Sequence, residues 1–162
     1  MSSRAGDRPS HGSLADMANQ DGGPRRVSIR DGLLTEPLDD LSKVRLQGSR
    51  CRQCNEVTLG RNSICPNCGG NELEAIPLSD RGELWTYTIV RHKPPGDYRG
   101  PEPFRPFGLG LVELPDGLRV MSPIEGDVDS LAVGTPLSLK IAVHHTGPSG
   151  EDVVAFAFAP AR

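Results

Sequence analysis

Four cysteines in two closely spaced pairs constrain this chain more than any other feature. Each pair has the spacing Cys-x-x-Cys, ten residues separate the pairs, and the chain has no other cysteine. This pattern matches a tetrahedral zinc site with four thiolate ligands, in which each pair forms a tight turn. Such a turn often needs a left-handed residue near its second cysteine, and Asn55 and Gly69 stand there. The predicted zinc ligands are Cys51, Cys54, Cys65 and Cys68.

A zinc site at these positions predicts a small ribbon, with short strands near 45–51, 56–60 and 72–78. Zinc held by four thiolates has no open position for water or substrate, so we expect a structural ion. Its main role would be to stabilise a segment too small to fold alone. Iron in a rubredoxin-type site is the alternative, and the short gap between the pairs favours the zinc ribbon.

Composition limits the remaining possibilities. Only 36% of the 162 residues are apolar and 4% aromatic, and 19 glycines and 15 prolines predict many turns, which favours a β-rich fold. The net charge of −3 would become about −5 with zinc on four thiolates, which argues against nucleic-acid binding by bulk charge. The sequence has no apolar run long enough for a transmembrane helix and no signal peptide. Cysteines with metal spacing and no signal indicate a cytoplasmic protein.

Three regions follow from the distribution of polar and apolar residues. Residues 1–30 are polar and predict a disordered tail. Residues 31–78 would hold a short helix and the ribbon, and residues 79–162 a second, β-rich domain. The helix is expected over 36–46, because leucines recur every three to four residues there and a proline suits the first turn. For Leu34, Leu38 and Leu41, core packing is favoured over docking on a partner.

The C-terminal half alternates apolar and polar residues with a period of two. From residue 84 to 90 the even-numbered side chains would face one way, and Trp85, Tyr87 and Ile89 the other. Further strands are predicted over 107–114, 118–124, 136–144 and 153–159. Five short strands in about 80 residues fit a small closed barrel, and the OB-fold is the leading candidate. The predicted fold is therefore mainly β: an N-terminal helix and a rubredoxin-like ribbon, followed by a five-stranded OB-fold barrel.

A connection of about sixteen residues, 91–106, joins the first two barrel strands. It is too long for a hairpin, rich in proline, and carries four Lys or Arg against two acids, whereas residues 108–162 carry three against seven. The loop therefore suggests an anion or partner site, and the alternative is a solvated loop. Lys and Arg suit phosphate or carboxylate groups, and an aromatic ring could pack on the apolar part of a ligand. The candidate ligand-binding residues are Arg91, Lys93, Tyr98, Arg99, Phe104 and Arg105.

No catalytic group stands out in the sequence. Every cysteine is assigned to the metal, and adjacent residues of a regular strand face opposite sides, so His144 and His145 should not form a dyad. No catalytic residue is therefore predicted, and any chemistry would belong to a partner.

Several stretches, taken in order, resemble the acyl-CoA-associated family known as domain of unknown function thirty-five. They are Leu46–Cys51, Cys65–Cys68, Leu78–Thr88, Phe107–Leu114 and Leu131–Gly134. The likeness runs from about residue 30 to 160. Within this family, the chain resembles the small subunit of benzylsuccinyl-CoA thiolase in particular. It implies a zinc ribbon with an OB-fold, and an accessory role beside a thiolase-fold catalytic subunit in a hetero-oligomer. Thiolase, acyltransferase and aldolase partners all fit, with an aromatic or dicarboxylic acyl-CoA as the expected ligand.

Three rival functions remain open at this point. Zinc ribbons and OB-folds also bind single-stranded nucleic acid, although the acidic barrel strands argue against it. A free-standing acyl-CoA-binding protein would use the same loop without a partner. A rubredoxin-like electron carrier would hold iron in place of zinc.

Overall fold

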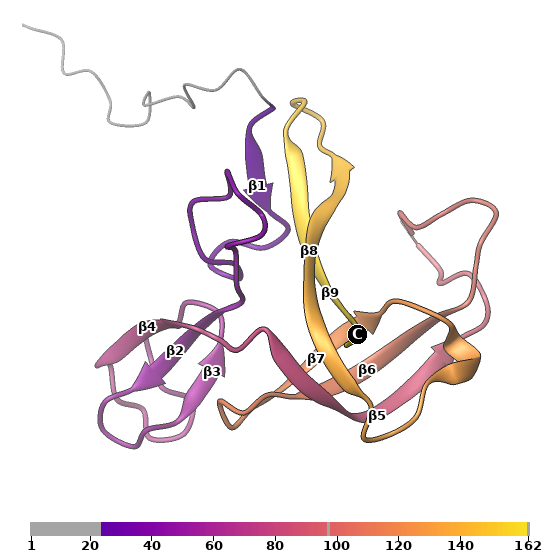
Figure 1. Ribbon diagram of the computed structural model, residues 1–162. Helices are drawn as coiled ribbons and strands as arrows, with labels where there is room; N and C mark the ends of the chain where they lie inside the picture. Colours follow the sequence, from indigo (N-terminus) through magenta and orange to yellow (C-terminus); the bar gives the residue numbers. More distant parts are fainter. Residues whose placement is uncertain (1–23, 97, 162) are drawn as a thin grey trace, which may run out of the picture.

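The computed structural model describes residues 24–96 and 98–161 and contains two β-sheets (Figure 1). The helical content of this described part is a single 3-10 turn, so the predicted mainly β fold is confirmed. In chain order the elements are β1 Arg26–Ser28, β2 Gln47–Cys51, β3 Val57–Leu59, β4 Leu73–Pro77, β5 Arg81–Val90, β6 Phe107–Glu113, β7 Arg119–Ile124, η2 Val128–Ser130, β8 Pro136–Thr146 and β9 Asp152–Pro160. None of the described segments forms a helix long and apolar enough to span a membrane.

The smaller sheet has the order β3-β2-β4, and both outer strands run antiparallel to β2. Its strands fall where the ribbon strands were predicted. The first Cys-x-x-Cys pair begins at the end of β2, and the second lies in the loop between β3 and β4. The sheet therefore brings the two pairs, which are separated in sequence, to the same end of the ribbon.

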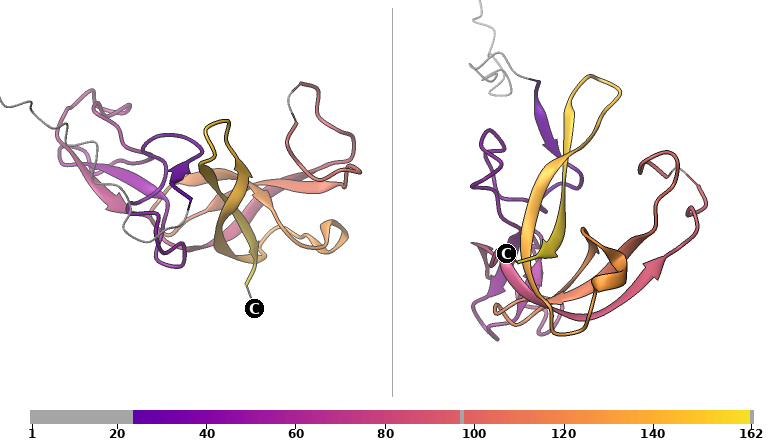
Figure 2. Two further views of the ribbon diagram at one scale, coloured as in Figure 1. Left: turned by 90° about the horizontal axis from the view of Figure 1, so that it is seen from above. Right: turned by 45° about the vertical axis from the view of Figure 1, so that its right-hand side comes forward.

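Strands β5 to β9 form the predicted five-stranded OB-type barrel. Strand β5 pairs with β6 and, at its start, with β8, and β8 pairs with β9. A parallel contact between Ile124 of β7 and Phe158 of β9 closes the barrel. The 91–106 loop between β5 and β6 and the β8–β9 hairpin rise on the same side of this barrel (Figure 2).

The N-terminal region differs from the sequence prediction in two places. Residues 1–23 of the predicted tail lie outside the described residues, but Arg26–Ser28 form strand β1, which pairs in parallel with β9. The helix predicted over 36–46 is wrong, because this segment forms turns. Asp40 accepts hydrogen bonds from the backbone N–H and the hydroxyl of Ser42 (3.1 and 2.6 Å), which stabilises a turn there and lowers the Asp40 pKa. The leucine spacing therefore reported burial and not helical conformation.

Strand β5 contains a β-bulge that changes which side chains face the core. The register with β6 shifts between Leu84 and Thr86, so Trp85 is the extra residue. Leu84 is fully buried, and Tyr87 also turns inward, where its hydroxyl donates a hydrogen bond to the carbonyl oxygen of Leu131 (2.6 Å). The simple alternation predicted for residues 84–90 is therefore wrong beyond the bulge, since Leu84 and Tyr87 share the inner face.

One hydrophobic core extends from the ribbon into the barrel. Leu46, just before β2, and Leu78, just after β4, belong to the same cluster as Leu84, Leu137 and Phe158 of the barrel strands. Leu34 and Leu38 are buried in it too, which confirms the core-packing interpretation for these two leucines, and Leu41 packs against it. The division into domains at residues 78 and 79 stays a prediction.

Candidate functional site

The four cysteine sulfurs converge on one point. All four Sγ atoms lie within 4.8 Å of one another, and the Cys51–Cys68 and Cys54–Cys65 Sγ pairs are each 3.6 Å apart. Tetrahedral zinc with Zn–S bonds of about 2.3 Å places neighbouring sulfurs about 3.8 Å apart. The donor set and spacing therefore fit a four-coordinate zinc ion.

The two Cys-x-x-Cys turns have matching backbone geometry. Asn55 and Gly69 both have positive φ, 61° and 72°, as the sequence predicted for the residue after each second cysteine. Their backbone N–H groups donate to the carbonyl oxygens of Cys51 and Cys65, both at 2.9 Å. The repeated left-handed residue is what folds each pair back so that both of its sulfurs face the same point.

The second cysteine of each pair also receives a backbone hydrogen bond. The N–H of Glu56 lowers the pKa of Cys54 to about 7, with support from the Asn67 amide 3.6 Å from its sulfur. The N–H of Gly70 acts in the same direction on Cys68, but hydrogen bonds with the neighbouring cysteines and burial together raise its pKa to about 12. The raised pKa of Cys68 opposes loss of its proton beside the other sulfurs, and a bound divalent cation would relieve this by favouring the thiolate.

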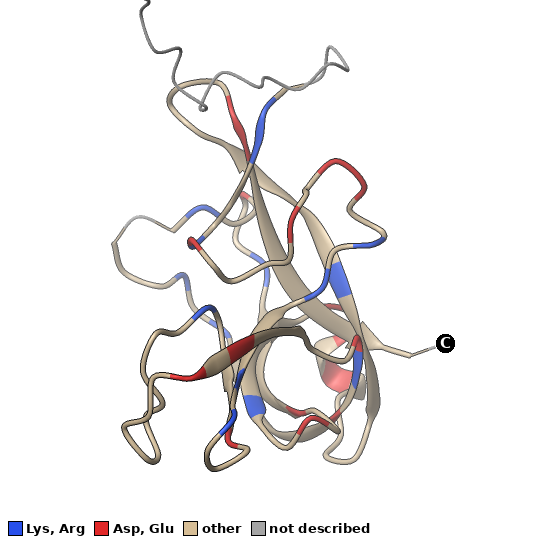
Figure 3. Cartoon of the chain, turned by 90° about the vertical axis from the view of Figure 1, so that its left-hand side faces the viewer, with Lys and Arg blue, Asp and Glu red and all other residues tan. Residues whose placement is uncertain are grey.

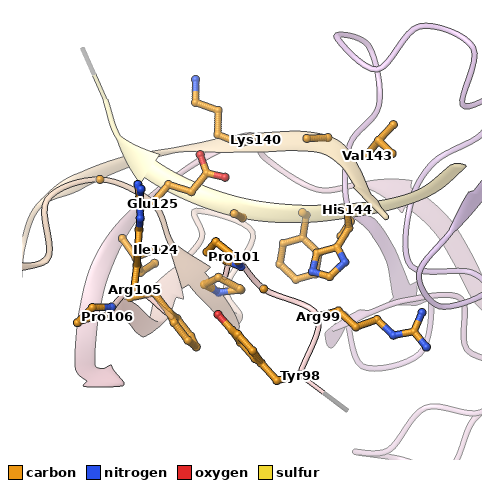
Figure 4. Close-up of a pocket in the computed structure, with 18 residues that line it drawn as sticks. Tyr98, Arg99, Pro101, Arg105, Pro106, Ile124, Glu125, Lys140, Val143 and His144 are labelled. Carbon is orange, nitrogen blue, oxygen red and sulfur yellow. The ribbon is translucent and has the colours of Figure 1, made fainter. Parts of the chain in front are cut away.

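A cleft of about 790 Å³ lies between the 91–106 loop and the barrel (Figure 4). The loop forms one wall, the ends of β6 and β7 lie at the base, and β8 and β9 form the other wall. Its apolar lining includes Phe107, Ile124 and Phe156. The charged lining residues are Arg99 and Arg105 from the loop, Glu125 after β7, and Lys140 on β8. Among the described lining residues, positive charge thus exceeds negative charge.

The structure divides the six predicted ligand-binding residues into two groups. Tyr98, Arg99 and Arg105 line the cleft, and the Phe104 ring packs edge-on against Tyr98 at 5.7 Å between centroids. Arg91 and Lys93 are absent from the lining. Arg91 Nη2 lies 3.9 Å from Asp129 Oδ1, and Lys93 forms an ion pair with Glu102 of its own loop. Both side chains therefore form ion pairs outside the cleft.

Three polar lining residues were not predicted from the sequence. Closure of the barrel brings three polar side chains to the cleft: Lys140, Glu125 and His144. Of these, only His144 was noted in the sequence, because it stands beside His145. Sequence reasoning placed His144 and His145 on opposite faces, and this is wrong. The β8–β9 register shifts between Val143 and His145, so His144 is a bulge residue, and the two Nδ1 atoms lie 2.9 Å apart.

Comparison with known proteins agrees with this architecture. The family model described as "ChsH2, C-terminal OB-fold domain" matches residues 75–142. A solved structure, the Ltp2-ChsH2(DUF35) aldolase, aligns with a TM-score of 0.55 and 25% identity over 72% of this chain and 84% of that one. The fold and the cysteine cluster thus define the class of protein: one in which a four-cysteine ribbon is joined to an OB-type barrel.

Curated relatives identify the family. The DUF35 domain-containing scaffold protein of Methanothermobacter thermautotrophicus is 30% identical over 118 residues, covering 71% of this chain and 86% of that protein. The benzoylsuccinyl-CoA thiolase subunit BbsA of Thauera aromatica is 28% identical over 127 residues, covering 78% and 83%. The chain belongs to the DUF35 family. Its thiolase relative is named for benzoylsuccinyl-CoA, where the sequence resemblance was to benzylsuccinyl-CoA thiolases.

Proposed function

We propose that this chain is a non-catalytic accessory subunit of a thiolase-like acyl-CoA enzyme. The observation that carries the proposal is that all four cysteines lie in one cluster, in a chain whose relatives include two benzoylsuccinyl-CoA thiolase subunits. Thiolysis requires a free cysteine nucleophile, and this chain has none to spare. The nucleophile would therefore come from a thiolase-fold partner, in a cytoplasmic hetero-oligomer.

In this proposal the cluster binds zinc in a structural role. Cys51, Cys54, Cys65 and Cys68 would each supply one thiolate, and the closed ligand set leaves no position for substrate. The ion would hold the two turns of the ribbon together, and the ribbon would in turn support the barrel through the shared core. The Zn²⁺ supplies no chemistry to the reaction.

The cleft would contact the acyl-CoA of the complex. Its volume of about 790 Å³ falls in the range of small-molecule sites. Arg99, Arg105 and Lys140 suit phosphate or carboxylate groups, and Tyr98 and Phe107, whose stacked rings lie 6.4 Å apart, suit an aromatic or adenine ring. An aromatic or dicarboxylic acyl group, such as a 3-oxoacyl-CoA derived from benzylsuccinyl-CoA, fits this combination.

Affinity purification of the tagged chain from its native cells tests the proposal. A stoichiometric thiolase-fold protein is the expected companion, and a chain that binds acyl-CoA alone would indicate a free-standing acyl-CoA-binding protein. In the complex, the double variant Arg99→Ala, Arg105→Ala should lower turnover without releasing the partner. Arg81→Ala, at the far end of β5, is the matched control and should have no effect. Unchanged turnover of the double variant would refute the role of the loop.

Nucleic-acid binding receives little support from the barrel surface. The exposed Trp85 ring, which could stack on a base, is covered by the Arg119 guanidinium at 3.9 Å from its centroid. Arg119 is itself hydrogen-bonded to Glu113. Basic and acidic residues are interspersed along the described chain on the ribbon side, without a continuous basic stripe (Figure 3).

A further inference from the structure

The bulge in β8 builds a histidine pair that a regular strand could not form. Val143 pairs with Val154 and His145 with Val153, so His144 has no partner in the β8–β9 ladder. The two rings are nearly perpendicular, at 83°, with centroids 5.1 Å apart and Nδ1 atoms at hydrogen-bonding distance, 2.9 Å. β-bulges commonly re-aim a side chain next to a functional site, and here the re-aimed side chain lines the cleft.

The hydrogen bond between the two Nδ1 atoms limits how the pair carries protons. One ring must donate through Nδ1–H, and the other must accept with a bare Nδ1. When both rings are neutral, the donor ring therefore has a bare Nε2, and the acceptor ring carries Nε2–H. One added proton fills the bare Nε2 and leaves the Nδ1 hydrogen bond intact. A second proton would break it, so the pair is suited to taking up one proton and one positive charge.

The surroundings of His144 favour the neutral form of its ring in the absence of an anion. His144 is exposed, but the part of its ring that faces the cleft wall is desolvated, and this, followed by the charges of His145 and Arg99, lowers the pKa of His144 below its usual value. Arg99 and His144 lie at one end of the cleft, and Arg105 and Glu125 at the other (Figure 4). Lys140 is the remaining charged group on the cleft walls, and the lining from β9 is Ala155, Phe156 and Ala157, which are uncharged. A nearby arginine disfavours a metal cation at these two imidazoles and favours an anion.

We propose that the Arg99 end of the cleft is an oxyanion-binding site, where the His144–His145 pair takes up one proton from solvent as a carboxylate or phosphate binds. The bound anion would lie between the Arg99 guanidinium and the protonated pair. Phe156 and the apolar β8 wall beside it would contact the apolar body of the same ligand. The inference rests on the proposed function only in using the same cleft, and it specifies the ligand as an acid with an apolar part.

Isothermal titration calorimetry of the full chain, alone and in complex with its partner, tests this inference. Phenylsuccinate serves as the carboxylate probe and coenzyme A as the phosphate probe, each titrated in two buffers that differ in ionisation enthalpy. We expect about one proton taken up per bound anion at pH 7, and affinity that falls roughly tenfold per pH unit as the pH rises. Binding of phenylsuccinate would assign the site to the acyl carboxylate, and binding of coenzyme A to its phosphates.

Three variants separate the pair from the arginine. Arg99→Ala should weaken binding of the probe at least tenfold, whereas the double variant His144→Phe, His145→Phe should abolish proton uptake and flatten the pH dependence while binding persists. His92→Gln, at an exposed histidine of the loop, is the control and should behave as the parent chain. Binding of neither probe, or binding without proton uptake, overturns the inference. Either result would leave the proposed function standing if the thiolase-fold partner co-purifies and the arginine variants lower turnover.

Discussion

The shared core predicts that damage beside the ribbon will destabilise the barrel. Leu46 lies just before β2, is 0% exposed, and belongs to the cluster that reaches Phe158. Replacing it by alanine removes three buried carbons, which costs about 2.5 kcal/mol in transfer free energy at about 0.8 kcal/mol per methylene. The residual cavity raises the expected loss of unfolding free energy to about 3–4 kcal/mol. For a chain of this size, Tm should fall by about 10–15 °C.

The single tryptophan makes the assay selective. Trp85 lies on β5 of the barrel, so its fluorescence during urea unfolding reports the barrel and not the ribbon. Leu46→Ala should shift this transition to lower urea, and the unfolding free energy obtained from it should fall by the whole of the expected loss of about 3–4 kcal/mol. Val133→Ala, at a side chain that is 64% exposed, is the control and should change stability by less than about 0.5 kcal/mol. If the Trp85 transition stays in place while metal is released at lower urea, the two sheets unfold independently and the reasoning fails.

Two further predictions concern the metal and the packing of the barrel. The purified protein should contain about one zinc per chain by atomic emission. Cys65→Ser should lower both the zinc content and Tm, because the ion holds the two turns of the ribbon together. Full zinc content in the variant would contradict the four-cysteine site. Gly110→Ala should cost about 1–3 kcal/mol in urea unfolding, since the added Cβ would lie 2.7 Å from Leu84 Cδ1. A neutral effect would mean that Leu84 can move away without loss.

Local features of the chain were predictable where a short motif determines the geometry. The Cys-x-x-Cys spacing and the left-handed Asn55 and Gly69 are properties of four or five neighbouring residues, and the structure agrees with them. The long loop was identified by its length and charge alone, and three of its six candidate residues line the cleft. The strand positions followed from alternation and turn residues.

The two bulges could not be predicted, because a bulge is a property of two paired strands. Trp85 and His144 each sit within a run that alternates well by itself, and their displacement appears only in the register with β6 and β9. The prediction of a helix over 36–46 was wrong for a related reason, because it missed a pairing between two separate positions. Leu34 forms an antiparallel β-bridge with Leu46. Lys140 and Glu125 joined the cleft only through barrel closure.

The bulge at His144 lowers the stability of the β8–β9 ladder, but the role proposed for the histidine pair requires it. Deleting this one residue would let the β8–β9 ladder continue in regular register from Val143 to His145, and a regular ladder satisfies the backbone groups better. Directed evolution for thermal tolerance alone should therefore favour its loss. Retention of the extra residue in a parallel population that is also selected for activity of the complex would measure how much the histidine pair contributes to function.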